Sequence, residues 1–174
     1  MTLTDALISL DGKYRYRLSR EWDASADKMT FVMLNPSTAD ATLDDPTIRR
    51  CMGFARRDGF GGIYVVNLYA YRATDPKDMK RAIDPVGPDN DATLRFAFAR
   101  SADQGAPVIA AWGTHADPRR VREVRALMGN ADVYSLGVTK EGHPKHPLYI
   151  RADQRFERWP STASASHLTD RSPE

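Results

Sequence analysis

The sequence predicts an α/β fold, arranged as a three-layer α/β/α sandwich around a central, mainly parallel sheet. Short apolar runs of strand length alternate along the chain with segments that carry apolar residues at helical spacing. This alternation is typical of strands that are buried between two layers of helices. The length of 174 residues, with 41% hydrophobic and 28% charged residues, fits one globular domain with a core of its own.

The first half of the chain contains three expected strands and one strong helix. Aromatic or apolar side chains alternate with basic ones over Tyr14–Leu18, as in a half-exposed strand at a sheet edge. Thr30–Leu34 and Ile63–Leu68 are mainly apolar and predict buried strands. Between them, Pro46–Arg57 predicts a helix, because Asp45 can cap it and proline is favoured at the first helical position.

The second half of the chain repeats this alternation. Lys77–Ala82 and Asp91–Ala102 are expected to be helices, and Asp117-Pro118 is expected to open another. Pro107–Gly113 and Val133–Leu136 are expected to be buried strands. From Thr30 onward, each expected strand is thus separated from the next by a helical segment, as a parallel sheet requires.

The expected domain covers most of the chain but not its C-terminal end. Residues 1–157 are expected to form it, and residues 158–174, rich in Ser, Thr, Ala and charge, are expected to be a disordered tail. No apolar run is long enough to span a bilayer, and residues 1–10 lack a signal-peptide pattern. The sequence therefore predicts a cytoplasmic protein without a membrane contact or an obligate protein partner.

The charge and the cysteine content narrow the chemistry. The only cysteine, Cys51, excludes an intramolecular disulfide and a cysteine-ligated cluster, and we expect it to be a small packing residue. The net charge of +2 does not by itself indicate nucleic-acid binding. Two groups of arginines could contact phosphates or form solvated helix faces. They are Arg49, Arg50, Arg56 and Arg57, and Arg119, Arg120, Arg122 and Arg125.

Polar side chains follow three of the expected core strands. Because the carboxyl ends of parallel strands meet at one edge of a sheet, we expect these side chains to share a crevice. Amides, imidazoles, aromatic rings and a cation together suit a planar hydrogen-bonding ligand such as a nucleobase. The residues are Asn35, Pro36 and Ser37 after the first strand, Asn67, Tyr69, Tyr71 and Arg72 after the second, and His143 and His146 after the last.

Motifs of other enzyme classes are missing. The sequence has no Gly-x-Ser-x-Gly element, no Walker lysine loop and no dinucleotide-binding glycine pattern after a strand. His143 and His146 could ligate a metal together with nearby acids, but a proline breaks this pair and the acids suit helix caps or solvated positions. We therefore expect no metal and no cofactor. The acids in question are Asp40, Asp44 and Asp45.

Three motifs resemble a bacterial family catalogued as domain of unknown function 1643. They are Met33–Ser37 followed by Asp44–Cys51, then Val66–Thr74, and then His146–Tyr149. The similarity covers about Tyr14–Ile150. More distantly, the chain resembles the uracil-DNA glycosylase superfamily, which has an α/β/α sandwich fold. The motifs of that superfamily are Gly–hydrophobic–Asn–Pro–Gly and a later His-Pro-Ser.

The sequence matches the two superfamily motifs only in part. The Asn-Pro element is similar to Asn35-Pro36, with Met33 and Ser37 in place of both glycines. The His-Pro element is similar to the segment that starts at His143 or to the one that starts at His146. The resemblance implies that Asn35 positions a water for attack on the sugar carbon. It also implies that the histidine stabilises negative charge on the departing base.

The resemblance further implies how a substrate binds. Asn67 reads the edge of the base, Leu148 wedges into a duplex, and cationic side chains contact phosphates. The expected function is hydrolysis of an N-glycosidic bond of a base in DNA or a nucleoside. Because asparagine replaces the aspartate of the most active members, a non-catalytic nucleotide or nucleic-acid binding module and a small-molecule enzyme stay open. The expected phosphate contacts are Arg49, Arg50 and Lys145, and Pro36, Ser37, Tyr69 and Arg72 complete the expected substrate site.

Overall fold

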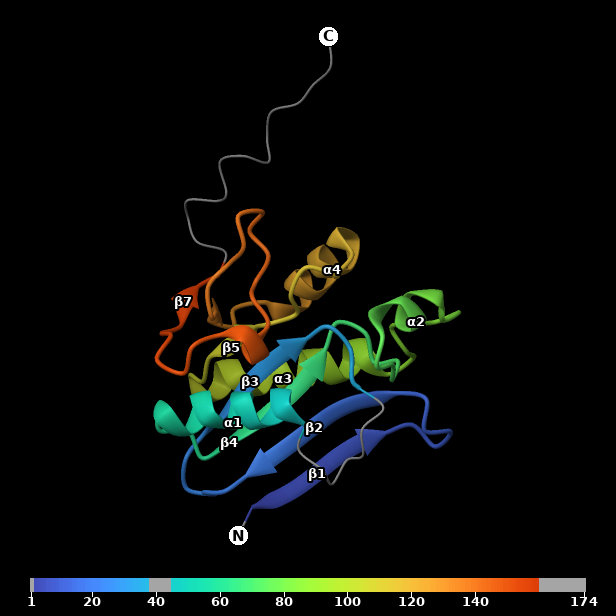
Figure 1. Ribbon diagram of the computed structural model, residues 1–174. Coiled ribbons are helices and arrows are strands. Elements are labelled where there is room, and N and C mark those ends of the chain that lie inside the picture. Colours follow the sequence, from blue (N-terminus) through green and yellow to red (C-terminus); the bar gives the residue numbers. More distant parts are fainter. Residues whose placement is uncertain (1, 38–44, 160–174) are drawn as a thin grey trace.

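The computed structural model describes residues 2–37 and 45–159, which form an α/β structure around a seven-stranded mixed sheet (Figure 1). The strand order is β1-β2-β4-β3-β5-β6-β7. The strands are β1 (Leu3–Ile8), β2 (Arg15–Glu21), β3 (Lys28–Met33), β4 (Gly62–Asn67), β5 (Val108–Ala110), β6 (Val133–Ser135) and β7 (Glu157–Arg158). The helices are α1 (Pro46–Arg57), α2 (Pro76–Arg81), α3 (Asn90–Gln104), α4 (Pro118–Met128) and a short 3-10 helix, η1 (Pro147–Tyr149).

The sheet is less parallel than the sequence predicts. The four central strands β4, β3, β5 and β6 are parallel, whereas β1, β2 and β7 pair antiparallel to their neighbours. A short hairpin connection joins β1 to β2, and such a connection permits only antiparallel pairing. The expected edge strand is therefore wrong: Tyr14–Leu18 belongs largely to β2, which β1 covers on its outer side.

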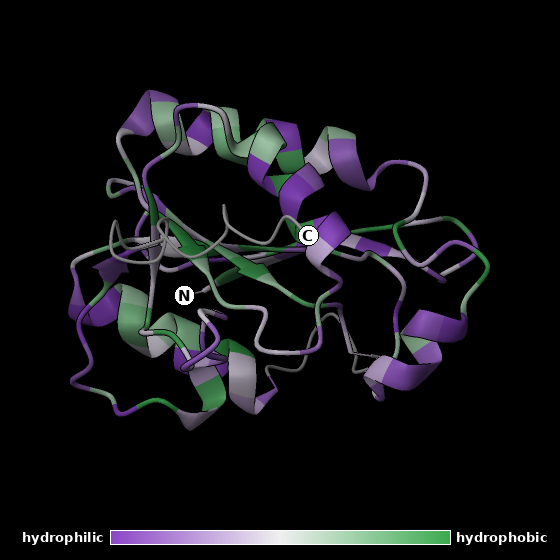
Figure 2. Ribbon diagram, turned by 90° about the horizontal axis from the view of Figure 1, so that it is seen from above, coloured by the Kyte–Doolittle hydropathy of each residue, from purple (hydrophilic) through white to green (hydrophobic). Residues whose placement is uncertain are grey.

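Helices pack against both faces of the sheet (Figure 2). On one face α1 buries Ile48, Cys51 and Phe54 against side chains of the central strands. On the other face α3 and α4 bury Leu94, Val124 and their neighbours against the same strands. The two helix layers leave the carboxyl ends of β3 and β4 as the place where loops gather.

The start of α1 has the cap that the sequence predicts. The carboxylate of Asp45 accepts a hydrogen bond from the backbone N–H of Ile48 at 2.8 Å, and Pro46 occupies the first helical position. Further along, Cys51 is completely buried, and burial raises the pKa of its thiol. The surroundings of Cys51 are therefore those of a packing residue.

The folded part extends beyond the expected boundary at residue 157. Arg158 belongs to β7, and the ring of Trp159 packs edge-on against Trp112 with 4.9 Å between centroids. The indole N–H of Trp159 donates to the carbonyl of Gly142. A composition-based boundary missed these contacts, because a single aromatic residue anchors the segment. Residues 160–174 of the expected tail lie outside the described part. No helix in the described ranges is long and apolar enough to cross a membrane.

Candidate functional site

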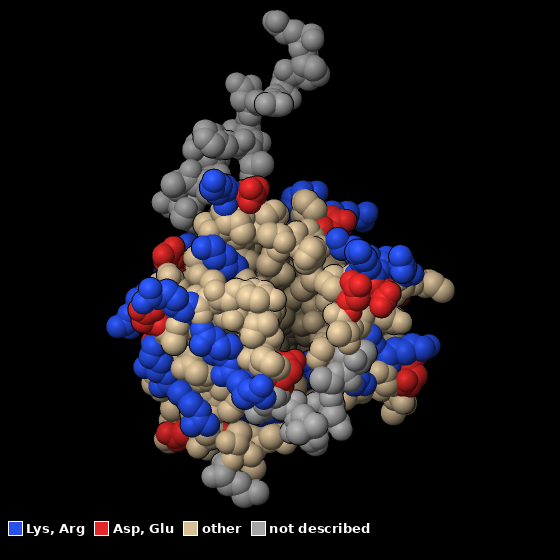
Figure 3. Space-filling view, viewed as in Figure 1, with Lys and Arg blue, Asp and Glu red and all other residues tan. Residues whose placement is uncertain are grey.

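A cavity of about 730 Å³ opens beside the carboxyl ends of β3 and β4. It is bordered by the first turn of α1 and by η1, and a hollow is visible near the middle of the face in Figure 3. Polar groups and a few aromatic rings line it, which is typical of a small-molecule site. The polar lining residues are Arg15, Asn35, Ser37, Asp45, Thr47, Asn67, Thr74, Thr114, His115, Thr139, Lys145 and His146.

The expected site residues separate into two groups. Six of them line the cavity, although they come from distant parts of the chain. The other seven do not line it. The lining residues are Asn35, Pro36, Ser37, Asn67, Lys145 and His146. Those outside the lining are His143, Tyr69, Tyr71, Arg72, Leu148, Arg49 and Arg50.

Asn35 follows β3 and has a fixed side-chain amide. Its Nδ2 donates to the carbonyl of Ala73 at 2.8 Å and to the carbonyl of Pro36 at 3.1 Å. An amide has two N–H donors, so both are used by these backbone acceptors. The carbonyl oxygen Oδ1 makes no hydrogen bond to another described residue, and Asn35 therefore offers the cavity an oriented acceptor.

Asn67, the last residue of β4, is 3% exposed and lines the same cavity. Its backbone carbonyl accepts a hydrogen bond from Asn90 at 3.1 Å, whereas its side-chain amide has no hydrogen-bond partner in the described ranges. The buried polar side-chain atoms that lack a partner in the described ranges do not include those of Asn67, so its amide is open to the cavity. Asn67 therefore presents both donors and an acceptor to whatever occupies the cavity.

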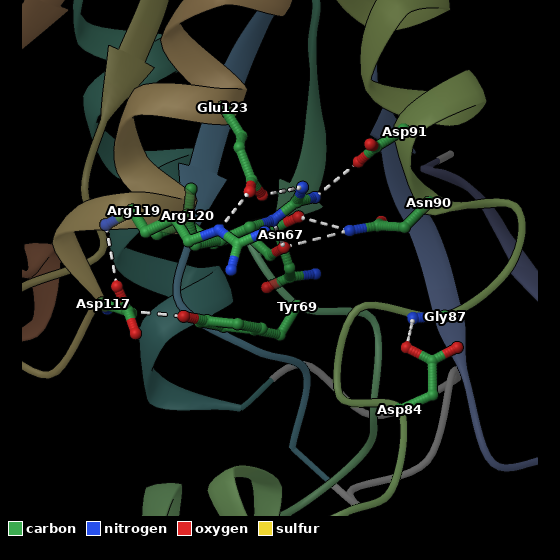
Figure 4. Close-up of polar contacts among 11 residues, drawn as sticks. Asn67, Tyr69, Asp84, Gly87, Asn90, Asp91, Asp117, Arg119, Arg120 and Glu123 are labelled. Carbon is green, nitrogen blue, oxygen red and sulfur yellow. Dashed lines mark hydrogen bonds and ion pairs between the residues drawn. The ribbon is translucent and has the colours of Figure 1, made fainter.

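The backbone around Asn67 is held from the layer of α3 and α4 (Figure 4). The buried amide of Asn90 donates to the carbonyls of Asn67 and Leu68, both at 3.1 Å. The Nε of buried Arg120 donates to the Leu68 carbonyl at 2.8 Å, and its guanidinium also pairs with Asp91 at 2.6 Å. These contacts make the end of β4 a rigid support for the Asn67 side chain.

His146 precedes η1, and its imidazole caps this short helix. Nδ1 accepts a hydrogen bond from the backbone N–H of Leu148 at 3.3 Å. Burial lowers the pKa of His146, and the charge of Asp45 opposes this change only in part. A neutral imidazole that accepts at Nδ1 carries its proton on Nε2. His146 therefore provides an uncharged N–H donor at the cavity.

The two candidate histidines differ in their position relative to the cavity. His146 lines the cavity, whereas the backbone N–H of His143 donates to the hydroxyl of Thr139 and the His143 side chain lies outside the lining. Of the two candidates, His146 alone is placed to contact a ligand in this cavity.

Two further expected contacts have other roles in the fold. The hydroxyl of Tyr69 accepts a hydrogen bond from the backbone N–H of Asp117, and burial raises the pKa of this phenol (Figure 4). Arg72 donates to the carbonyl of Gly12 at 3.0 Å. Both side chains therefore support loops around the cavity, and their expected contact with a substrate stays a prediction.

The basic side chains of α1 gather on the surface below the cavity in Figure 3. Arg50 donates to the carbonyl of Ile150, and Arg56 lies over the ring of Trp22 at 4.2 Å. Arg49 is exposed. Several of these arginines thus hold the structure together, and phosphate contacts by Arg49 and Arg50 stay a prediction.

Sequence reasoning missed Arg15 as a cavity residue. The alternating pattern of β2 predicted solvent-facing basic side chains, but Arg15 is 5% exposed and lines the cavity. The pKa of Arg15 is lowered to about 10, and burial is the main cause. Repulsion from Arg72 lowers the pKa further, whereas attraction by Asp45 partly opposes the change. The guanidinium is still protonated at neutral pH. No local signal marks this position, because its burial comes from the loops that close over the start of β2.

The described residues contain few side chains that could act together as metal ligands. No group of three or more His, Cys, Asp or Glu side chains in the described ranges could hold a metal ion. Asp45 uses its carboxylate to cap α1 and to accept from the hydroxyl of Ser37 at 3.3 Å. Two of the acids considered for a metal site, Asp40 and Asp44, lie outside the described residues.

Comparison with known proteins places the chain in a family. The family described as "Protein of unknown function (DUF1643)" matches residues 15–148, which is well over half of the chain. The comparisons with curated proteins and with solved structures give no match. The family match covers nearly the span expected from the three motifs, including Asn35, Asn67 and His146. The chain belongs to the DUF1643 family.

Proposed function

We propose that the cavity binds a nucleobase and that the protein hydrolyses the N-glycosidic bond joining this base to its sugar. The observation that carries the proposal is the side-chain amide of Asn67, which is open to the cavity and makes no hydrogen bond to another described residue. A base edge presents donors and acceptors in one plane, and an amide can pair with both. A ligand of this kind would satisfy the amide.

Two other groups at the cavity fit the chemistry. The oriented Oδ1 of Asn35 can accept a hydrogen bond from a water and hold it for attack. The neutral Nε2–H of His146 can donate to a base oxygen on which negative charge develops. The neutral imidazole suits this role, because its Nε2–H can donate a hydrogen bond to the negative charge on the base at neutral pH. The imidazole does not have to take up a second proton first.

The proposed reaction balances as a hydrolysis. The water oxygen bonds to the anomeric carbon of the sugar as the bond from this carbon to the base nitrogen breaks. The electron pair of that bond moves to the base, where His146 stabilises it. One proton of the water ends on the released base, so that the products are the free base and the sugar hydroxyl. Asn35 orients the water but takes no proton, since an amide is not a base near neutral pH.

The distant resemblance to the uracil-DNA glycosylase superfamily supports this proposal. The Asn35-Pro36 pair after β3 lines the same cavity as His146, which directly precedes Pro147, the first residue of η1. Helices on both faces of the sheet are compatible with the superfamily's α/β/α sandwich. We infer that the chain shares this finer architecture and uses Asn35 and His146 as the resemblance implies.

Base release tests the proposed function directly. Oligonucleotides and nucleosides that carry uracil, hypoxanthine or alkylated bases are incubated with the protein, and free base and abasic sites are measured. We expect release by the unmodified protein and a loss of roughly 100-fold in Asn35→Ala and in His146→Gln. Asn130→Ala is a matched control, because Asn130 is exposed and does not line the cavity.

Binding separates the alternatives. Calorimetry with the same nucleosides is expected to give a dissociation constant that Asn67→Ala weakens at least tenfold. Binding without release would identify a nucleotide-binding module and would refute the hydrolysis. If no base or nucleoside binds or reacts, the cavity belongs to a small-molecule enzyme of another class.

A further inference from the structure

We propose that the protein forms a twofold-symmetric dimer in which the edge strands β1 of two copies pair antiparallel. Leu3 of each copy then enters a hollow beside β1 of the other copy. This interaction surface lies at the β1 edge of the sheet, so it is independent of the function proposed for the cavity at β3 and β4.

The two edges of the sheet are protected to different degrees (Figure 1). β7 has only two residues, Glu157 and Arg158, and both are charged and exposed. β1 has six residues, of which Asp5 alone is charged, and it contains neither lysine nor proline. Short length, charge and proline keep an edge strand from pairing with another chain. β1 has little of this protection, and its outer side pairs with no strand in the described ranges, so that side can accept a further strand.

Large apolar side chains of β1 are exposed at this edge. Leu3 is 60% exposed and Leu7 is 45% exposed. Both lie on the same face of the sheet as Asp5, because side chains alternate along a strand. The carboxylate of Asp5 pairs on that face with Arg17 of β2. A dimer that covers the two leucines removes apolar surface from water, which favours association.

A hollow of about 650 Å³ lies beside the end of β1 and the turn that follows it. Its walls are mainly apolar and aromatic. They include Leu7, Leu10 and the rings of Tyr14 and Tyr16, which stack with 6.0 Å between their centroids. An apolar side chain suits such a hollow, and a leucine fits within its volume.

The spacing between Leu3 and the hollow fits a twofold axis at Ala6. In an antiparallel pairing about Ala6, each residue lies opposite the one that is equally far from Ala6 in the other copy. Leu3 then lies opposite Ser9, which lines the hollow. Ser9 continues the pairing of the hairpin, because its N–H donates to the carbonyl of Tyr14 at 3.0 Å. Since opposite residues project to the same face, Leu3 of one copy points toward the hollow of the other.

The charges of β1 and β2 favour this axis and a second copy of the chain as the partner. With the axis at Ala6, Asp5 lies opposite Leu7 of the other copy, and Leu7 is paired in its own sheet with Arg17. Each carboxylate thus has an arginine of the other copy one strand further on, on the same face. An axis at Asp5 would instead place two carboxylates directly opposite each other, which is destabilising. The exposed leucine, the hollow and the opposite charges all lie on one chain, as an isologous interface requires.

Sedimentation velocity tests the proposal on the unmodified protein, Leu3→Lys and Asn130→Lys, from about 1 to 200 μM. We expect the unmodified protein to change from monomer to dimer over this range. Leu3→Lys should raise the dissociation constant of the dimer by roughly tenfold or more, because it brings a charge to the apolar hollow. Leu3 pairs in register with Glu21 of β2, so the lysine is tolerated within one copy. Asn130→Lys adds the same charge at an exposed site between α4 and β6 and should dimerise like the unmodified protein.

Hydrogen exchange locates the interface without a variant. Backbone amides of residues 3–9 should exchange more slowly at the highest protein concentration than at the lowest, whereas those of β7 should not change. A protein that is monomeric at every concentration would overturn the proposal and leave this edge to a partner of another kind. A dimer that Leu3→Lys does not weaken, or that leaves the exchange of residues 3–9 unchanged, would overturn it as well. The exchange of the unmodified protein decides the matter even if Leu3→Lys does not fold.

Discussion

The polar groups at the end of β4 have two contrasting surroundings. Toward α3 and α4, the backbone carbonyls of Asn67 and Leu68 are held by the buried side chains of Asn90 and Arg120. Toward the cavity, the Asn67 amide has no hydrogen-bond partner in the described part of the chain. The backbone carbonyls on the side of α3 and α4 have protein donors, whereas the Asn67 amide is left for water or a ligand in the cavity. Rigid support of this kind is what a binding side chain needs to keep its geometry.

Removal of Arg120 should have the largest effect on stability. Arg120→Met deletes charge-assisted hydrogen bonds to the Leu68 carbonyl and to Asp91, and should lower the free energy of unfolding by about 3 kcal/mol. Asp91 is 41% exposed and can be solvated, which limits the loss. Urea denaturation of both proteins measures the difference. A change below about 1 kcal/mol would show that the Leu68 carbonyl does not need this support.

The two asparagines at this strand end should respond in opposite ways. Asn90→Ala removes two hydrogen bonds, which lowers the free energy of unfolding. It also removes the buried Oδ1 of Asn90, which has no partner within the described residues, and this partly offsets the loss. The expected net decrease is about 1–2 kcal/mol. Asn67→Ala removes none and should change it by no more than about 0.5 kcal/mol, while ligand affinity falls. Denaturation and calorimetry on both variants test this contrast. Equal destabilisation by both would contradict it.

The pH dependence of stability should report the neutral imidazole of His146. Its pKa in the folded protein is lowered by burial, so the unfolded chain binds more protons below about pH 6.5. The stability that the neutral His146 contributes is fully present above that pH. It is lost as the pH falls through the pKa of the folded protein, and the free energy of unfolding then changes by at most about 1.4 kcal/mol per pH unit. Unfolding of the unmodified protein and of His146→Gln between pH 5 and 8 measures it. Identical slopes would mean that His146 is not desolvated.

The smallest effect is expected at Tyr69. Tyr69→Phe removes the acceptor for the backbone N–H of Asp117, a contact of 3.3 Å at the start of α4. The expected loss is about 1 kcal/mol or less, because water can reach the exposed Asp117. Thermal unfolding gives the difference, and base binding should not change. A loss of ligand affinity in this variant would instead return Tyr69 to the substrate site.

Local sequence signals predicted the central strands and most helices. Periodicity identified β3, β4, β5 and β6, and the Asp-Pro pairs marked the starts of α1 and α4. The strand β1 was missed, since its side chains, several of them apolar, are exposed or half-buried and form no buried face. Its presence decides that β2 is covered on its outer side, and it adds one antiparallel pairing to those of β2 with β4 and of β6 with β7.

The sequence by itself determined the family, and it predicted that Asn35, Asn67 and a histidine of the 143–146 segment gather at one edge of the sheet, because residues at the carboxyl ends of parallel strands converge. Only the tertiary structure decided that His146 rather than His143 lines the cavity, and that Arg15 is buried beside it. The reason is physical. Strand ends follow from local periodicity, whereas the burial of a single side chain depends on loops that come from distant parts of the chain.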